Sequence, residues 1–153
     1  MITKAFCTFI TIFITGILSA QTESDMDDAL KVCNDKVFTQ VDILPDLKNG
    51  KAAFEDSLTG YLKKKNALPK SGNVTYTFII TMQSKILDIK KVEGDVKYED
   101  RVKEALISIP DIWIPANQNS HPVCAYVGLN IEFSENKLKV KIVEPVSVQL
   151  GFQ

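Results

Sequence analysis

The chain has 153 residues, of which 45% are hydrophobic, and its 18 basic and 19 acidic residues give a net charge of −1. This length and hydrophobic content predict one domain with a core of its own. The balanced charge, without a row of Lys or Arg interleaved with aromatic residues, argues against nucleic acid as a partner.

The first twenty residues have the layout of a secretory signal peptide. Lys4 precedes an apolar run from Ala5 to Leu18, and the small pair Ser19-Ala20 stands before polar Gln21. Cleavage after this pair is therefore predicted, and it would release the protein outside the cytoplasm. The alternative is an uncleaved membrane anchor, because about 20 apolar residues span a bilayer.

The predicted organisation has four parts along the chain. These are a signal peptide (1–20), a polar N-terminal lead (21–36), one domain (37–144) and a C-terminal tail (145–153).

Two cysteines, Cys33 and Cys124, remain after signal removal, in a compartment where disulfides persist. A bridge between them would close a loop of about 90 residues and stabilise the fold by roughly 4 to 5 kcal/mol. The alternative is two buried free thiols.

The single histidine, His121, lies beside a proline in a predicted loop and is expected to be solvated. No metal site and no cofactor are expected, because the short ligand spacing of a metal centre is absent.

The domain is predicted to begin with a strand over residues 37–43, which Pro45 and the turn residues 48–50 end. A helix is predicted over Lys51–Lys65. Its apolar residues recur at i, i+4, i+7 and i+8 and form one stripe, made of Phe54, Leu58, Tyr61 and Leu62. The lysines at its C-terminal end favour the helix macrodipole.

A β-hairpin follows this helix. Residues 73–82 alternate between apolar and Thr-rich faces, which predicts a strand. Gln83-Ser84 is predicted to turn the chain into a second strand over Lys85–Glu93, with Leu87 and Ile89 on one face. Gly94-Asp95 is predicted to end that strand.

The C-terminal half predicts a second helix over Tyr98–Ile109, which Pro110 stops. Trp113, flanked by apolar residues, is expected to lie in the core. One long strand is predicted over Val123–Phe133, and a last strand over Leu138–Ile142 alternates with lysines that would protect an exposed edge.

These elements predict an α+β two-layer sandwich of two helices on a small antiparallel sheet. Their order is β-α-β-β-α-β with an extra C-terminal strand. No nucleophile elbow, phosphate-binding glycine loop or zinc-protease motif is present in the sequence. An enzyme is therefore not expected, and neither is a small-molecule substrate.

The ordered set of residues over 37–133 resembles the TonB C-terminal domain family of the Bacteroidetes type. The residues that carry the resemblance are Pro45, Gly50, Phe54, Leu62, Leu68-Pro69, 74–80, 88–92, Ala105-Leu106, Pro110, Trp113, Pro115-Ala116, Pro122-Val123, Tyr126 and Phe133. The chain departs from the family at the entry turn LPDLKNG, at Ser84 and Ser120 where glycines are common, and by one extra residue before Trp113. It resembles a divergent member.

The resemblance implies a periplasmic protein-binding module, related to transmembrane transport, that takes an extended peptide of an outer-membrane transporter or another envelope protein as an added strand. The candidate binding groups are the main chains of Val140, Lys141 and Ile142. Only about 16 residues separate the predicted cleavage point from the first predicted strand, roughly 50 to 60 Å when extended. The long periplasmic linker of an energy transducer is therefore missing, although by this resemblance an uncleaved N-terminus would make the protein a short transducer anchored in the inner membrane. A homodimer is compatible with the sequence.

Overall fold

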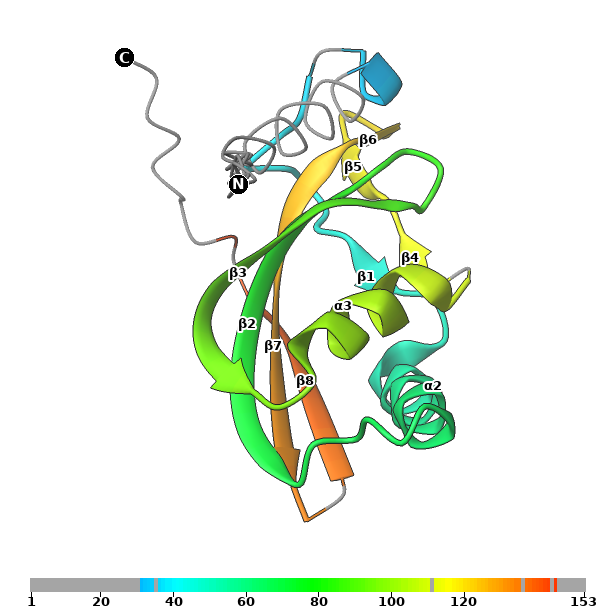
Figure 1. The fold of residues 1–153 in the computed structure, drawn as a ribbon. Coiled ribbons are helices and arrows are strands. Elements are labelled where there is room, and N and C mark those ends of the chain that lie inside the picture. Colours follow the sequence, from blue (N-terminus) through cyan, green and yellow to red (C-terminus); the bar gives the residue numbers. More distant parts are fainter. Residues whose placement is uncertain (1–30, 35, 111, 136, 144, 146–153) are drawn as a thin grey trace, which may run out of the picture.

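The computed structural model describes residues 31–34, 36–110, 112–135, 137–143 and 145 (Figure 1). The predicted signal peptide, most of the polar lead and nearly all of the C-terminal tail lie outside these residues.

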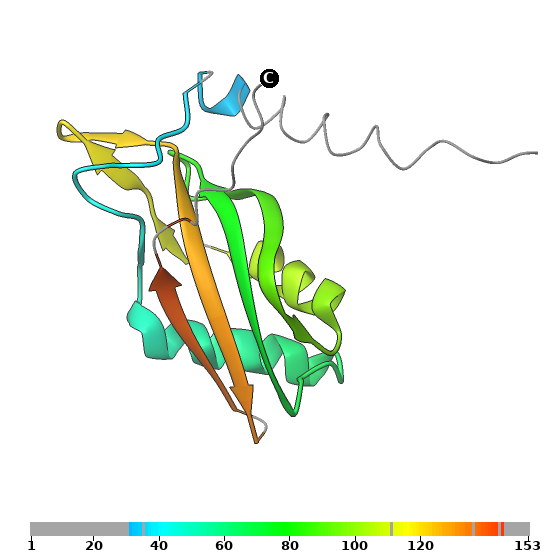
Figure 2. The ribbon, with the colours of Figure 1, turned by 90° about the vertical axis from the view of Figure 1, so that its left-hand side faces the viewer.

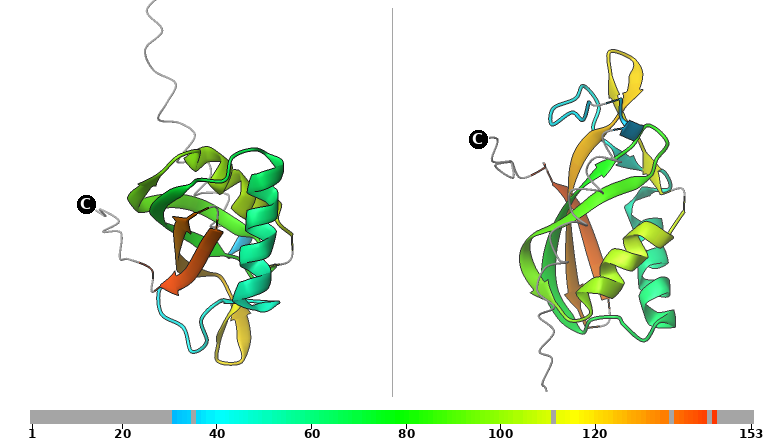
Figure 3. Two further views of the ribbon diagram at one scale, coloured as in Figure 1. Left: turned by 90° about the horizontal axis from the view of Figure 1, so that it is seen from below. Right: turned by 45° about the horizontal axis from the view of Figure 1, so that its top comes forward.

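A four-stranded antiparallel sheet forms one layer of the fold, in the order β3-β2-β7-β8. The strands are β2 (Ser71–Ile80), β3 (Ile86–Val96), β7 (Ala125–Ser134) and β8 (Lys137–Val143). The helices α2 (Gly50–Lys64) and α3 (Glu99–Ser108) cover one face of this sheet (Figures 1 and 3). The predicted α+β class is confirmed for the described residues, which form two helices and antiparallel strands, but the strands divide into one four-stranded and two two-stranded sheets instead of a single sheet.

The main core lies between the helices and the sheet. Helix α2 buries the stripe Phe54, Leu58 and Leu62, as its apolar spacing predicts. Strand β2 faces them with alternate residues, and Val102, Ala105 and Leu106 of α3 complete the layer. Trp113 is 2% exposed and its ring centroid lies 5.5 Å from that of Phe78, so the expectation of a core tryptophan is confirmed.

Among the described residues, a second apolar cluster lies at one end of the other face of the sheet. This cluster joins Ile79 of β2 to Cys33 and Cys124, with Leu87 and Tyr126 packed against it. The two cysteines form a disulfide with a Cα–Cα distance of 5.7 Å. This bond attaches the start of the described chain to the residue that precedes β7.

The strand predicted over residues 37–43 is wrong. Phe38 and Ile43 make only isolated bridges, to Ala125 and Asn117, and the first strand is β1 (Asp46–Leu47). The reason is the lack of a continuous partner, because β7 pairs with β2 on one side and with β8 from Gly128 onward on the other. The segment therefore forms an irregular strap that bridges the main sheet at Phe38 only and meets Asn117 at Ile43.

The hairpin is longer and less regular than predicted. Strand β3 continues through Gly94, whose φ of +82° and close approach to the Asn73 carbonyl exclude a side chain there. Leu87 packs against the disulfide cluster, whereas Ile89 packs against the main core, so the prediction that they share a face is wrong. The cause is a register shift between β2 and β3, where Asp88 has a φ of 53° and reverses the alternation.

The strand predicted over Val123–Phe133 is divided at Cys124. Its first part, β6 (His121–Val123), pairs with β5 (Ala116–Gln118) in a separate hairpin. The two turn residues of that hairpin, Asn119 and Ser120, have φ values of 52° and 65°, as in the two-residue turns that match strand twist. This hairpin projects from one end of the sheet (Figure 3), and β4 (Trp113–Ile114), just before it, pairs with β1.

Candidate functional site

Strand β8 is the regular outer edge of the main sheet. It pairs with β7 from Gly128 to Ser134 without a register shift, and no described strand pairs with its other side (Figure 2). The opposite edge is β3, which carries two register shifts against β2. Because bulges bend an edge and hinder further pairing, β8 is the better platform for an added strand.

A groove of about 240 Å³ lies beside β8. The three binding candidates from the sequence, Val140, Lys141 and Ile142, all line it. The structure brings them together with three residues from the beginning of the domain, which are Asp46, Leu47 and Lys51. The groove therefore runs between the outer edge of the sheet and the start of α2.

A carboxylate occupies one main-chain donor of this edge. The N–H of Val140 donates to Oε1 of Glu55 on α2 at 2.8 Å. The same oxygen lies 3.8 Å from Nζ of Lys51, one helical turn earlier. Among the described residues no other side chain bonds to the main chain of β8.

This hydrogen bond fixes the direction in which the main-chain groups of β8 point. In an antiparallel strand, successive residues turn their N–H and C=O groups to opposite sides. Since Val140 faces outward, Ile142 also faces outward, and Lys141 turns its main chain toward Asn130 of β7. Of the three candidate main chains, two lie at the free edge, and the third residue can contribute only its side chain.

The side chains of β8 separate into two rows. Leu138 and Val140 are 5% and 2% exposed and face the helices. The other row consists of Lys137, Lys139 and Lys141, which are exposed on the opposite face of the sheet. We call these three residues the lysine row.

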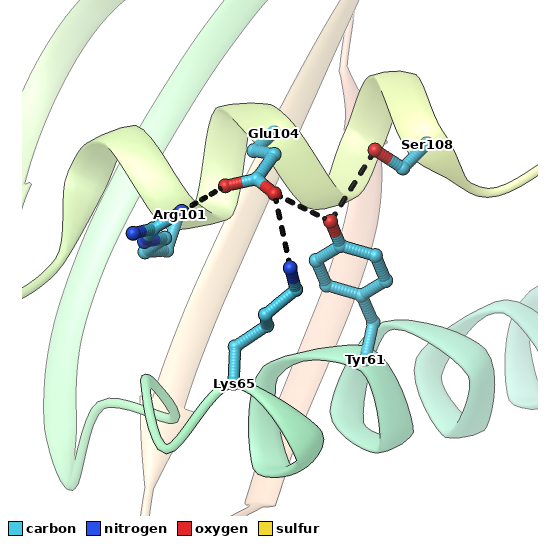
Figure 4. Close-up of polar contacts among 5 residues, drawn as sticks. All are labelled: Tyr61, Lys65, Arg101, Glu104 and Ser108. Atoms are coloured by element: carbon cyan, nitrogen blue, oxygen red, sulfur yellow. Dashed lines mark hydrogen bonds and ion pairs between the residues drawn. The ribbon is translucent and has the colours of Figure 1, made fainter.

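A polar cluster holds the two helices together (Figure 4). The Tyr61 hydroxyl of α2 donates to Glu104 of α3 at 2.8 Å, and Lys65 lies 3.5 Å from the same carboxylate. Arg101 forms an ion pair with it from one turn earlier in α3. This guanidinium and the Tyr61 hydroxyl lower the pKa of Glu104 to about 2. The cluster joins α3 to α2, and α2 supplies Lys51 to the groove and the Glu55 carboxylate to the Val140 N–H.

Other sequence candidates give no second site within the described part of the chain. His121 is exposed at the start of β6. No group of three or more His, Cys, Asp or Glu side chains in the described ranges could hold a metal ion. Likewise, none of the helices described is both long and apolar enough to span a bilayer.

Glu55 and the β1 residues of the groove were not found by sequence reasoning. The i,i+4 spacing of Lys51 and Glu55 indicates an ion pair on α2, but such pairs are common on solvated helix faces and do not indicate a binding site. Contact between α2 and β8 joins residues 85 positions apart, which one sequence does not reveal.

The chain matches no protein-family model, no curated protein and no solved structure.

Proposed function

We propose that the chain is a periplasmic protein-binding module that takes an extended peptide as an additional strand along the outer edge of β8. The partner class is an outer-membrane transporter or another envelope protein, in support of transmembrane transport. The resemblance of residues 37–133 to TonB C-terminal domains supports this mode, and the signal-like residues 1–20 support the compartment.

The observation that carries the proposal is the hydrogen bond from Val140 to Glu55. It leaves an edge donor of a regular strand paired with a side chain, in a position where a neighbouring strand would place a carbonyl oxygen. The Glu55 side chain can rotate away from the Val140 N–H, whereas a strand of the domain paired at this edge would block it permanently. Glu55 therefore satisfies the Val140 N–H and still leaves the edge of β8 available to an added strand.

Binding then becomes an exchange of acceptors. An incoming peptide carbonyl replaces the Glu55 carboxylate on the Val140 N–H, and further main-chain bonds form at Leu138 and Ile142. A hydrogen bond to a charged group contributes about 1.5 to 3 kcal/mol net. Breaking this one costs part of the binding energy, so Glu55 is expected to weaken peptide affinity.

The test is a titration of the purified chain with N-terminal peptides of outer-membrane transporters from the same organism, followed by amide chemical shifts. We expect shifts along β8, and we expect Glu55→Ala to tighten binding roughly 5- to 30-fold, equivalent to about 1 to 2 kcal/mol. The matched control is Asp56→Ala, which removes the same charge from an exposed neighbouring position.

A second variant tests the edge directly. Val140→Pro removes the outward N–H, which β7 does not use, and should abolish binding while the fold is retained in circular dichroism. Shifts confined to β3, or no shift at millimolar peptide, would refute strand addition at β8.

The apolar run from Ala5 to Leu18 favours one alternative, a short membrane-anchored energy transducer. Mass determination of the protein from membrane and soluble fractions separates the two. An intact N-terminus in the membrane fraction would support the transducer.

A further inference from the structure

The lysine row of β8, Lys137, Lys139 and Lys141, carries positive charge that the fold leaves largely uncompensated. None of the three forms an ion pair with a residue in the described part of the chain. Their cross-strand neighbours on β7 are Ser134, Glu132 and Asn130, in that order. Only the middle lysine therefore faces an opposite charge.

An added strand would supply the second set of neighbours. Directly opposite residues of paired antiparallel strands have Cβ atoms about 4.5 to 5.5 Å apart, close enough for opposite charges to attract and like charges to repel. A partner strand on β8 would place every second side chain beside the lysine row. Acidic residues at those positions complement it.

The intervening side chains of such a partner face the helix side of the sheet. The groove is lined by Leu47, Val140 and Ile142, as well as by Asp46, Lys51 and Lys141, the last of which belongs to the lysine row. Apolar side chains fit the first three of these residues. A strand that complements both faces of β8 therefore alternates acidic residues with apolar residues.

We infer, on the basis of the proposed function, that the partner of β8 is an extended segment that alternates acidic and apolar residues. Its acidic side chains lie beside the lysine row, and its apolar side chains lie in the groove.

The same charges argue against two other occupants. A second copy paired through β8 in antiparallel register would set one lysine row beside another, which is unfavourable. The chain's own residues 146–153, VSVQLGFQ, alternate apolar with uncharged residues and offer nothing to the lysines.

Three capped heptapeptides that alternate Val with Glu, Ser or Lys provide the test. They are titrated into the purified full chain at low salt and at 0.5 M NaCl, with amide shifts of β8 as the readout. We expect the Glu peptide to bind most tightly and the Lys peptide most weakly, and the added salt to reduce this difference. The triple variant K137Q/K139Q/K141Q should weaken the Glu peptide about tenfold at low salt and leave the Ser peptide unchanged.

The control K63Q/K64Q/K70Q makes the same change in net charge at exposed lysines elsewhere and should leave all three affinities unchanged. Equal binding of the three peptides along β8 would overturn the charge inference and leave strand addition intact. Failure of all three peptides and of the transporter peptides to shift β8 would instead overturn strand addition. The inference also fails if deletion of residues 146–153 is needed for any peptide to bind, or if a dimer forms that Val140→Pro dissociates.

Discussion

The disulfide between Cys33 and Cys124 should contribute a large share of the stability of this domain. It joins residues 91 positions apart and so encloses most of the described chain. For a loop of this length, the chain-entropy relation gives a stabilisation of about 4.6 kcal/mol at 25 °C. A domain of roughly 110 residues has an unfolding entropy of about 0.23 kcal/mol/K at its midpoint. The variant C33A/C124A should therefore melt about 20 °C below the oxidised protein.

Calorimetry with and without reducing agent is the assay. Alanine suits both positions, because the cysteines are 4% and 2% exposed in an apolar cluster. Reductant should lower the melting temperature of the natural protein and leave that of the double variant unchanged. A fall of less than about 5 °C would refute the loop-closure account. It would show that the bond only holds the strap locally, and the Phe38 amide, which donates to Cys124, would then lose its exchange protection without global destabilisation.

Two further predictions concern the core and the helix pair. Trp113→Ala should cost about 3 to 5 kcal/mol of unfolding free energy in urea, because it empties a site packed against Phe78, whereas Ile114→Ala at the exposed next position should cost under about 1 kcal/mol. Glu104→Gln should lower stability at pH 7. The pKa of Glu104 falls from 4.5 to about 2 on folding, so its contribution is complete above pH 4.5 and is lost as the pH falls toward 2. Urea unfolding should therefore give stabilities of the natural protein and the Gln variant that converge between pH 4.5 and 2, and a gap that stays constant would contradict this assignment.

Elements that bury one continuous face were predictable from the sequence. Helix α2 follows its apolar stripe, and β2 places Val74, Tyr76, Phe78 and Ile80 in the core as their alternation indicates. In these segments local periodicity and tertiary burial require the same conformation, so one sequence is enough.

Segments whose conformation depends on a distant partner were not predictable. The strap over residues 37–43 has the composition of a strand, but β8 leaves only residues 125–127 of β7 unpaired on that side, and the strap bridges just one of them, Ala125. The shift at Asp88 reverses a pattern that alternation alone would continue. For the candidate site, the sequence indicated the residues of β8, but the Glu55 cap depends on how α2 packs and is not visible in any local pattern.

Two features of β8 disfavour pairing with β8 of a second copy of the chain. The same two features would select the strand of the proposed partner. A capped Val140 N–H and three like charges in a row discourage pairing between copies of the chain, since each copy would have to displace Glu55 and oppose lysine with lysine. A partner with acidic side chains in alternate positions is attracted by the lysine row. It has only to displace Glu55 from the Val140 N–H. In the proposed function, specificity at this edge therefore comes from residues that protect it, because main-chain hydrogen bonds alone would accept almost any extended peptide.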